Sequence, residues 1–258
     1  MLIKKISCKS LLNKTNLPFD YCLNPYTGCS HGCVYCYARF MLKYTGHKEE
    51  WGSFVDVKAN AIEILKKEII KSNPGTIFLS SVTDPYQKIE KNYELTRNIL
   101  KTLPKTFKPC ILTKSSLFTR DLDLLKQFGE AEVGVTITSM NDWKNFEPGA
   151  SPTIERVKAL REAHEAGLKT YVFLGPVLPY ITDKHFDKLM SEINFVDKVM
   201  VDRLNIKSGN WPRIKKVLQE KYPSLFKNFN KAVFENDDYY DDFKKKIRNL
   251  KKDAEFCF

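Results

Sequence analysis

Short apolar runs alternate along the chain with longer stretches in which apolar residues recur at helical spacing. The segment TIFLSSV (76–82) has the length and composition of a buried strand, whereas residues 90–103 place Leu95, Ile99 and Leu103 on one helical face. Further strands are expected at 109–115, 131–138, 168–177 and 195–204, and further helices at 120–128, 152–166, 183–193 and 211–221. With one strand before the first clustered cysteine, the pattern gives about six βα units.

Strict alternation of strands and helices predicts an α/β fold with a parallel sheet, open or closed into a barrel. In the helix at 152–166, Ser151 is the expected N-cap, Pro152 the first helical residue and Gly167 the residue after the last turn. The carboxyl edge of a parallel sheet carries the site in such folds. Polar residues follow the predicted strands at that edge: Thr83, Asp84, Thr113, Lys114, Thr138, Ser139, Asn205 and Lys207.

The α/β pattern occupies the middle of the chain. We expect an N-terminal extension at 1–20, the α/β unit at 21–207, and a C-terminal helical segment with a tail at 208–258. The tail from residue 228 mixes an acidic block with a basic block. We therefore expect it to form a surface helix or a partly disordered arm.

The composition is that of a globular protein, with 43% hydrophobic and 28% charged residues among 258. No apolar run approaches the roughly 18 residues of a membrane span. No apolar segment of signal-peptide length follows the basic N-terminus, so we expect a cytoplasmic protein without membrane contact. The net charge of +11 favours nucleic acid as a partner or reflects a compositional bias towards lysine.

Three of the seven cysteines lie on one short stretch, NPYTGCSHGCVYCYARF (24–40), with the spacing C-x3-C-x2-C. Cys29, Cys33 and Cys36 could hold three irons of a [4Fe–4S] cluster and leave the fourth iron open. A zinc site with Cys22 as fourth ligand is one alternative, although structural zinc usually takes two separate cysteine pairs. Buried free thiols are the other alternative. The glycines and polar residues around the cysteines indicate a loop, which favours the cluster.

This pattern, with an aromatic residue before the last cysteine, resembles the signature of radical S-adenosylmethionine (radical SAM) enzymes. The wider chain is similar to one branch of them, the spore photoproduct lyase-like or "DNA repair photolyase" proteins. The matching segments follow the family's order: the cysteine stretch, EWGSFVDVKANA (50–61), VTDPYQ (82–87), ELTR (94–97), TKS (113–115), RDLDLL (120–125) and FEPGASP (146–152) with Arg156.

The resemblance implies a partial (β/α)6 barrel of the radical SAM type, whose mouth encloses a radical. Its cofactors would be a [4Fe–4S] cluster on Cys29, Cys33 and Cys36, and S-adenosylmethionine (SAM) on the open iron. Reductive cleavage of SAM leaves methionine and a 5′-deoxyadenosyl radical, which abstracts hydrogen from a substrate. A flavodoxin- or ferredoxin-type protein would supply the electron.

The resemblance also implies a set of SAM-binding residues: Tyr35 near the adenine, Thr83 and Asp84 at the methionine moiety, Lys114 at its carboxylate, Thr136 and Thr138 at the ribose, and Arg156 at the carboxylate or paired with Glu147. Each has a structural alternative. The tyrosine could pack on the barrel, the Thr-Asp pair could form the turn before a proline, the threonines could reflect strand propensity, and the lysine could be solvated.

One family feature is missing. Spore photoproduct lyases use a cysteine near the end of the second strand as a hydrogen-atom donor, whereas this chain has Ser80 and Ser81 there. Repair of thymine lesions by the same route is therefore not the leading expectation, and a radical reaction on another substrate ranks above it. A nucleic-acid-directed enzyme and a non-enzymatic cluster or zinc protein are the alternatives. Tyr37 and Tyr86 are conceivable donors, but the sequence selects no catalytic side chain.

Overall fold

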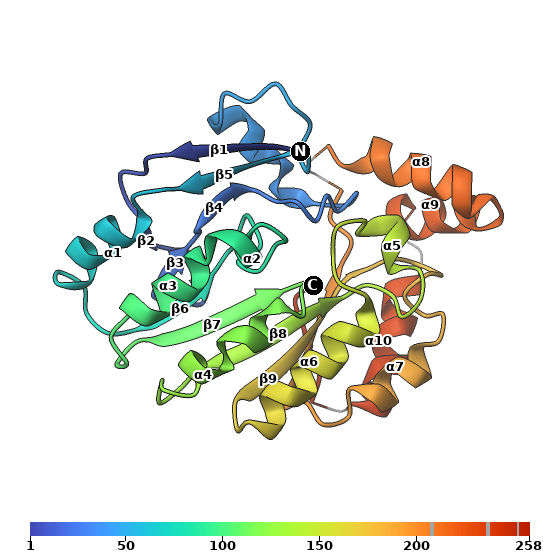
Figure 1. Ribbon diagram of the computed structural model, residues 1–258. Helices are drawn as coiled ribbons and strands as arrows, with labels where there is room; N and C mark the ends of the chain where they lie inside the picture. The colour runs from blue at the N-terminus through green and yellow to red at the C-terminus, as the bar shows by residue number, and fades with distance from the viewer. Residues whose placement is uncertain (207–208, 236–237, 252) are drawn as a thin grey trace.

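The computed structural model describes residues 1–206, 209–235, 238–251 and 253–258 (Figure 1). Its main sheet has eight strands in the order β11-β10-β9-β8-β7-β6-β3-β2. The strands are β2 (Leu12–Lys14), β3 (Tyr21–Leu23), β6 (Thr76–Leu79), β7 (Lys108–Thr113), β8 (Glu132–Ile137), β9 (Lys169–Val177), β10 (Lys198–Arg203) and β11 (Glu255–Phe256). All neighbouring pairs are parallel except β2 and β3. The predicted parallel α/β sheet is therefore confirmed, as an open sheet between β2 and β11.

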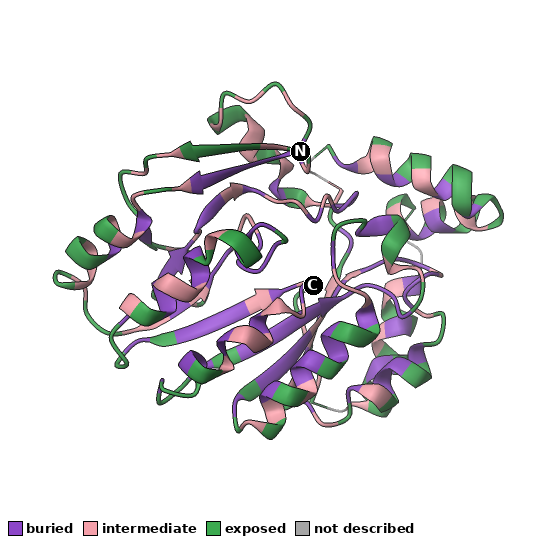
Figure 2. Cartoon of the chain, viewed as in Figure 1, coloured by how far each residue is buried: buried purple, intermediate pink, exposed green. Residues whose placement is uncertain are grey.

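Most of the helices lie against the main sheet and bury its core, and the others pack into a second buried cluster with the residues around Cys33 (Figures 1 and 2). The helices are α1 (Ala61–Ile69), α2 (Glu90–Tyr93), α3 (Leu95–Thr102), α4 (Leu122–Leu125), α5 (Trp143–Phe146), α6 (Thr153–Glu165), α7 (Phe186–Glu192), α8 (Trp211–Lys221), α9 (Phe226–Phe234) and α10 (Tyr239–Leu250), with short 3₁₀ segments η1 (Tyr37–Tyr44), η2 (Leu117–Asp121) and η3 (Pro223–Leu225). In α3, Leu95, Ile99 and Leu100 are buried, as the helical spacing predicted for the first two.

A second sheet carries the cysteine stretch. It has the order β1-β5-β4, from β1 (Leu2–Ile6), β5 (Phe54–Lys58) and β4 (Tyr26–Gly28). The outer strand β1 is largely exposed, whereas β5 is buried (Figure 2). Residues expected as an N-terminal extension thus pair with both sheets, through β1 and β2. The expected boundary between residues 207 and 208, and Lys207 itself, lie outside the described residues.

The C-terminal tail is not an arm. In α10, Tyr239, Phe243 and Ile247 are buried and join the main core. The strand β11 then pairs with β10, so the tail adds an edge strand to the main sheet. The expected surface helix is therefore present as α10, and the helical spacing of its apolar residues within the charged blocks explains why one of its faces packs on the core.

Two predicted elements end differently. The strand at 76–82 stops at Leu79, because Ser80 takes a left-handed conformation with φ 78°. The helix at 90–103 is broken at Glu94, where φ is 47°. The second piece has its own cap: the carboxylate of Glu90 accepts hydrogen bonds from Thr96 N at 3.0 Å and Arg97 N at 3.3 Å.

The start of α6 also differs from the prediction, while its end is confirmed. Ser151 is not the N-cap, since Pro152 occupies that position and the Ser151 hydroxyl accepts a hydrogen bond from Ser116 N at 3.1 Å. Gly167 follows the last turn with φ 85°, a conformation that glycine adopts without strain. Among the described residues, no helix is long and apolar enough to cross a membrane.

Candidate functional site

The three clustered cysteines lie on one loop between β4 and η1, which we call the cysteine loop (residues 29–36). Burial raises the pKa of the Cys29 thiol well above its usual value, and the charges of Asp84, Cys33 and Cys36 raise it further. Burial likewise raises the pKa of Cys33 to about 12, although the nearby Lys114 acts against this rise. The thiols are thus close enough for their charges to interact.

The donor set fits a cluster that bonds each cysteine to a different iron. Among the described residues, no group of three or more His, Cys, Asp or Glu side chains is arranged to hold a single metal ion. Cys22, the expected fourth ligand of a zinc site, instead lies with its sulfur 3.1 Å from the Ser81 hydroxyl. Three thiols on one buried loop can hold a [4Fe–4S] cluster with one open iron, and we take this fit as the basis for the function proposed below.

Gln87 holds the first part of the cysteine loop. The side chain is fully buried, and its Oε1 accepts a hydrogen bond from Ser30 N at 2.7 Å. Its Nε2 donates to Gly28 O at 3.3 Å and to Thr83 Oγ1 at 3.1 Å. The Thr83 hydroxyl also donates to Gly28 O. Thr83 and Gln87 therefore fix the backbone on both sides of Cys29.

Asp84 joins the cysteine loop to the carboxyl end of β7. Its Oδ2 lies 3.1 Å from Nε2 of His31 and accepts a hydrogen bond from Lys114 N at 2.9 Å. Its Oδ1 accepts from Thr113 Oγ1 at 2.7 Å and from Tyr86 N at 2.9 Å. Burial acts to raise the pKa of Asp84, but His31, Thr113 and the amide of Lys114 outweigh it and hold the pKa at about 2.

His31 lies inside the protein and connects the cysteine loop to the FEPGASP segment. It is 2% exposed, so it is not a solvent-exposed loop histidine. Its Nδ1 lies 3.0 Å from Gly149 O. A Cβ on Gly149 would stand 2.2 Å from Ser30 O, so only glycine permits this approach of the FEPGASP segment to the loop.

Glu147 holds the second part of the loop. Its Oε1 accepts hydrogen bonds from the Tyr35 hydroxyl and from Thr138 Oγ1, the latter at 3.1 Å. Its Oε2 pairs with Arg156 NH2, and both side chains are fully buried. Arg156 also donates to the carbonyl oxygens of Ser151 at 2.7 Å and Thr136 at 2.8 Å. The predicted pairing of Arg156 with Glu147 is thus confirmed.

Lys114 lies beside both halves of the loop. Its Nζ is 5.9 Å from the centre of the Tyr35 ring and has no hydrogen-bond acceptor among the described residues. Burial acts to lower the pKa of Lys114, but the charges of Cys33, Glu147 and Asp84 outweigh it and raise the pKa. A partly buried ammonium without an acceptor can bind an anionic group.

The structure therefore brings all ten predicted site residues to one edge of the sheet, at the carboxyl ends of β6, β7 and β8. These residues differ in whether their side chains already bond to other protein atoms. The polar side-chain atoms of Thr83, Asp84, Thr138 and Arg156 already bond to protein atoms. The ammonium of Lys114, by contrast, has no acceptor among the described residues.

Four of the residues whose contacts with the loop were not predicted from the sequence are Gln87, Glu147, Trp51 and Asn210. Gln87 and Glu147 are described above. Trp51 Nε1 donates a hydrogen bond to Cys36 Sγ at 3.2 Å, and Asn210 Nδ2 donates to Tyr35 O at 2.6 Å. Three of the four lie in the segments VTDPYQ, FEPGASP and EWGSFVDVKANA. Membership of a family motif was therefore a signal that could have singled them out, although the motifs do not show which residues contact the loop. Asn210 lies outside every motif.

The two tyrosines considered as hydrogen donors lie in different surroundings. Tyr37 is 50% exposed, and its hydroxyl donates a hydrogen bond to Ser81 O beside the cysteine loop. Tyr86 is fully buried and packs against Phe118, with ring centres 6.3 Å apart. Only Tyr37 therefore lies where a substrate could approach.

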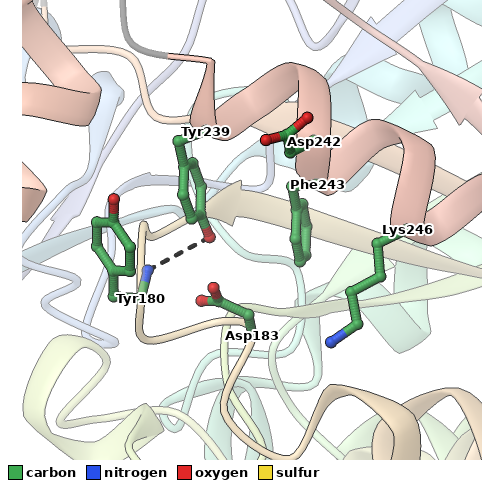
Figure 3. Close-up of a pocket in the computed structure, with 6 residues that line it drawn as sticks. All are labelled: Tyr180, Asp183, Tyr239, Asp242, Phe243 and Lys246. Atoms are coloured by element: carbon green, nitrogen blue, oxygen red, sulfur yellow. Dashed lines mark hydrogen bonds between the residues drawn. The ribbon is translucent and has the colours of Figure 1, made fainter.

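A pocket of about 340 Å³ lies away from these residues, between α10 and the segment after β9 (Figure 3). Tyr180, Asp183, Tyr239, Asp242, Phe243 and Lys246 line it. In Figure 3 the carboxylate of Asp183 points towards Tyr239, whose hydroxyl accepts a hydrogen bond from Tyr180 N at 3.3 Å. None of the predicted site residues lines this pocket.

Known proteins are similar to this chain in sequence and in fold. The model of the Radical SAM superfamily matches residues 23–193. An uncharacterized protein of Methanocaldococcus jannaschii is 39% identical over 97% of this chain and 93% of its own length. An uncharacterized protein of Mycobacterium tuberculosis is 33% identical over 73% of this chain but only 60% of its own length.

Solved structures of spore photoproduct lyase share the fold. A mutant with bound AdoMet and dinucleoside spore photoproduct superimposes with a TM-score of 0.69, at 16% identity, over 100% of this chain and 82% of that chain. A second mutant gives a TM-score of 0.68 at 18% identity, over 99% of this chain and 82% of that chain. At these identities the likeness concerns the fold alone.

Proposed function

We propose, because this chain belongs to the radical SAM superfamily, that its cysteine loop holds a [4Fe–4S] cluster and that the protein cleaves SAM reductively. The family indicates an enzyme of radical chemistry, so the electron-carrier and zinc-module alternatives are set aside. When bound, the two cofactors supply a 5′-deoxyadenosyl radical that abstracts hydrogen from a substrate. The protein's own residues hold the cofactors, orient them and exclude water.

One observation carries the proposal: three free cysteines, one buried and two half-buried, lie on a single loop that Gln87, Asp84 and Glu147 hold in place. Such a loop supplies one ligand to each of three irons and none to the fourth. Support from several separate elements fits a site that must keep its geometry while a cofactor reacts.

The polar contacts suggest how the SAM-binding residues divide their work. We assign Lys114 to the methionine carboxylate, because its ammonium lacks an acceptor in the described structure. Tyr35 offers its ring and backbone to the adenine, since Glu147 already takes its hydroxyl. Thr136 is assigned to the ribose. The remaining four residues are assigned to support the loop and the strand ends without contacting SAM: Thr83, Asp84, Thr138 and Arg156.

The test is anaerobic reconstitution with iron and sulfide, followed by dithionite and SAM, with 5′-deoxyadenosine as the product measured. We expect wild-type protein to form the product and Cys29→Ala, Cys33→Ala and Cys36→Ala each to lose it. Cys22→Ala and Cys110→Ala are matched controls. Both free thiols lie outside the cysteine loop, so these two variants should keep the cluster. Product in any of the three loop variants, or none in wild type that binds both cofactors and a substrate, would contradict the proposal.

Our second proposal is that the substrate is a nucleic acid. Two observations favour it: the net charge of +11, and an exposed aromatic row on η1 formed by Tyr37, Phe40 and Tyr44. Unpaired bases stack on such rings, and lysines bind the backbone. Binding to single-stranded DNA or RNA should weaken steeply as salt rises. Weak binding that does not respond to salt would sink this proposal.

A redox protein of the flavodoxin or ferredoxin type is proposed as the physiological electron donor, because reductive cleavage of SAM requires one electron for each event. Replacing dithionite by such a protein, with its own reductase, should restore 5′-deoxyadenosine formation.

A further inference from the structure

A tryptophan donates a hydrogen bond to one of the three clustered sulfurs. Trp51 is 2% exposed, and its Nε1 lies 3.2 Å from Cys36 Sγ. Its indole packs edge-on against Phe54, with ring centres 5.8 Å apart, so the ring is held in one orientation. A Cβ on the next residue, Gly52, would lie 2.8 Å from the Cα of Gly32, which shows how closely this segment approaches the cysteine loop.

An arginine from α8 reaches the same place. The guanidinium of Arg213 lies with one nitrogen 3.4 Å from Trp51 O and the other 3.5 Å from Gly32 O. Burial lowers the pKa of Arg213, and the like charge of Arg39 lowers it further. The charges of Glu50, Cys36 and Cys33 act in the opposite direction. The guanidinium of Arg213 thus lies beside the cysteine loop, where thiolates bound to a cluster would offset the cost of burying its charge.

Arg39 adds a second positive charge. Its Nη1 is buried and has no hydrogen-bond partner in the described part of the chain. Two guanidinium groups that repel each other in a partly buried place are unfavourable unless a negative charge compensates them. Three thiolates bound to an iron–sulfur cluster would supply such a charge.

We propose that Trp51 and Arg213 are positioning residues that make the cluster easier to reduce, with Arg39 as a further positive charge. This inference rests on the proposed function. Reduction adds one electron to the cluster, with no proton moved and no bond made or broken. The reduced form carries more negative charge, so an N–H donor to a ligating sulfur and a nearby cation stabilise it more than the oxidised form.

The test is the midpoint potential of the reconstituted cluster, measured without SAM by a mediated redox titration that follows the absorbance and the electron paramagnetic resonance signal. Trp51→Phe keeps an aromatic ring against Phe54 but lacks the N–H, and Arg213→Gln removes the charge. We expect each to shift the reduced-to-oxidised ratio at a fixed solution potential about tenfold towards the oxidised form, or about 59 mV for one electron.

Two variants serve as matched controls. Arg213→Lys keeps the charge, and Arg161→Gln removes a positive charge from α6, where Arg161 bonds Glu192 O, far along the chain from the loop contacts. Both should keep the wild-type potential. Unchanged potentials in Trp51→Phe and Arg213→Gln would overturn the inference.

Two further outcomes are decisive. Folded variants that lose the cluster would also overturn the tuning role, because the two residues would then hold the cluster in place. Circular dichroism and iron and sulfide content distinguish this case from unfolding, and an Arg39→Gln variant tests the cationic part if Arg213→Gln does not fold. Wild-type protein that takes up no cluster would contradict the proposed function itself.

Discussion

The carboxylate of Asp84 lies 3.1 Å from Nε2 of His31, and this buried pair links the end of β6 to the cysteine loop. Asp84→Ala should lower the free energy of unfolding by about 1–3 kcal/mol or more, because the Thr113 hydroxyl and the amides of Tyr86 and Lys114 then lack their acceptor. It should also lower the iron bound per chain after reconstitution. The exposed pair of Glu63 and Lys67 provides the control, since Glu63→Gln should leave the free energy of unfolding almost unchanged.

The same pair predicts an acid limit. The pKa of Asp84 is about 2 in the folded protein, below the ordinary 3.8. A lowered carboxyl pKa stabilises the fold above pH 3.8, and that stability is lost as pH falls through about 2. In urea unfolding over this range, Asp84→Asn should lose stability less steeply with acid than wild type does. Equal slopes would contradict the assignment.

Gln87 is predicted to be needed for cluster uptake. Gln87→Leu leaves the buried amide of Ser30 without its acceptor, at a cost of about 1–3 kcal/mol in the free energy of unfolding. The loop should then bind less iron and sulfide at equal reconstitution. Gln127→Leu is the control, because Gln127 is exposed and should leave both quantities unchanged. Full cluster content in Gln87→Leu would show that the hydrogen bonds of Gln87 are not needed for cluster uptake.

Glu147 and Arg156 should behave as a coupled pair. Glu147→Leu and Arg156→Met each leave a buried charge unpaired, so each should cost about 3–5 kcal/mol in the free energy of unfolding. The double variant should cost less than the sum of the two, with a coupling energy of about 0.5–3 kcal/mol. Urea denaturation of the four proteins gives the cycle. Strict additivity would mean that the two side chains do not depend on each other.

Lys114 should affect SAM binding and not the cluster. Lys114→Met should weaken SAM binding about 10-fold or more, because a charge-assisted contact is lost, while iron content stays at the wild-type level. Titration of the reconstituted protein with SAM measures this. Lys105→Met is the matched control, since Lys105 lies over the Phe128 ring away from the loop. An unchanged SAM affinity in Lys114→Met would remove Lys114 from the SAM site.

His47 predicts a second pH dependence of the free energy of unfolding, above pH 6.5. Its Nδ1 lies 2.9 Å from Glu49 and its Nε2 2.9 Å from Asp56. Burial acts to lower the pKa of His47, but these two carboxylates outweigh both burial and Lys4, and raise the pKa above 6.5. The stabilisation is therefore present below pH 6.5 and lost as pH rises through the raised pKa. Urea unfolding of His47→Gln should lack this fall, and a fall equal to that of wild type would contradict it.

Residue patterns predicted the sheet because buried parallel strands and their helices have strong periodicities. They also predicted that the polar residues after the strands lie together, since parallel strands bring their carboxyl ends to one edge. The patterns could not predict which side chains at that edge bond within the protein and which lack a partner there. Asp84 and Lys114 look alike in sequence, as polar residues after a strand, yet one is fully bonded within the protein and the other lacks an acceptor. That difference arises from contacts between distant segments.

The tail shows the same limit for the fold. A strand of two residues such as β11 has no periodicity, and it exists because the edge of β10 offers unpaired backbone groups. The break at Glu94 likewise depends on Glu90 reaching the amides of Thr96 and Arg97. Neither can be seen in a helical or strand pattern.

The supports of the cysteine loop also set an order of events in folding. They come from increasingly distant parts of the chain: Ser30 bonds Gln87 across 57 positions, Tyr35 bonds Glu147 across 112, and Asn210 bonds Tyr35 across 175. Contacts of such long range form late, because closing long loops costs chain entropy. We therefore expect the loop near the start of the chain to be among the last parts to reach its final shape. Iron and sulfide would be delivered to a chain that is almost fully folded, and a fragment ending before Asn210 would hold them poorly.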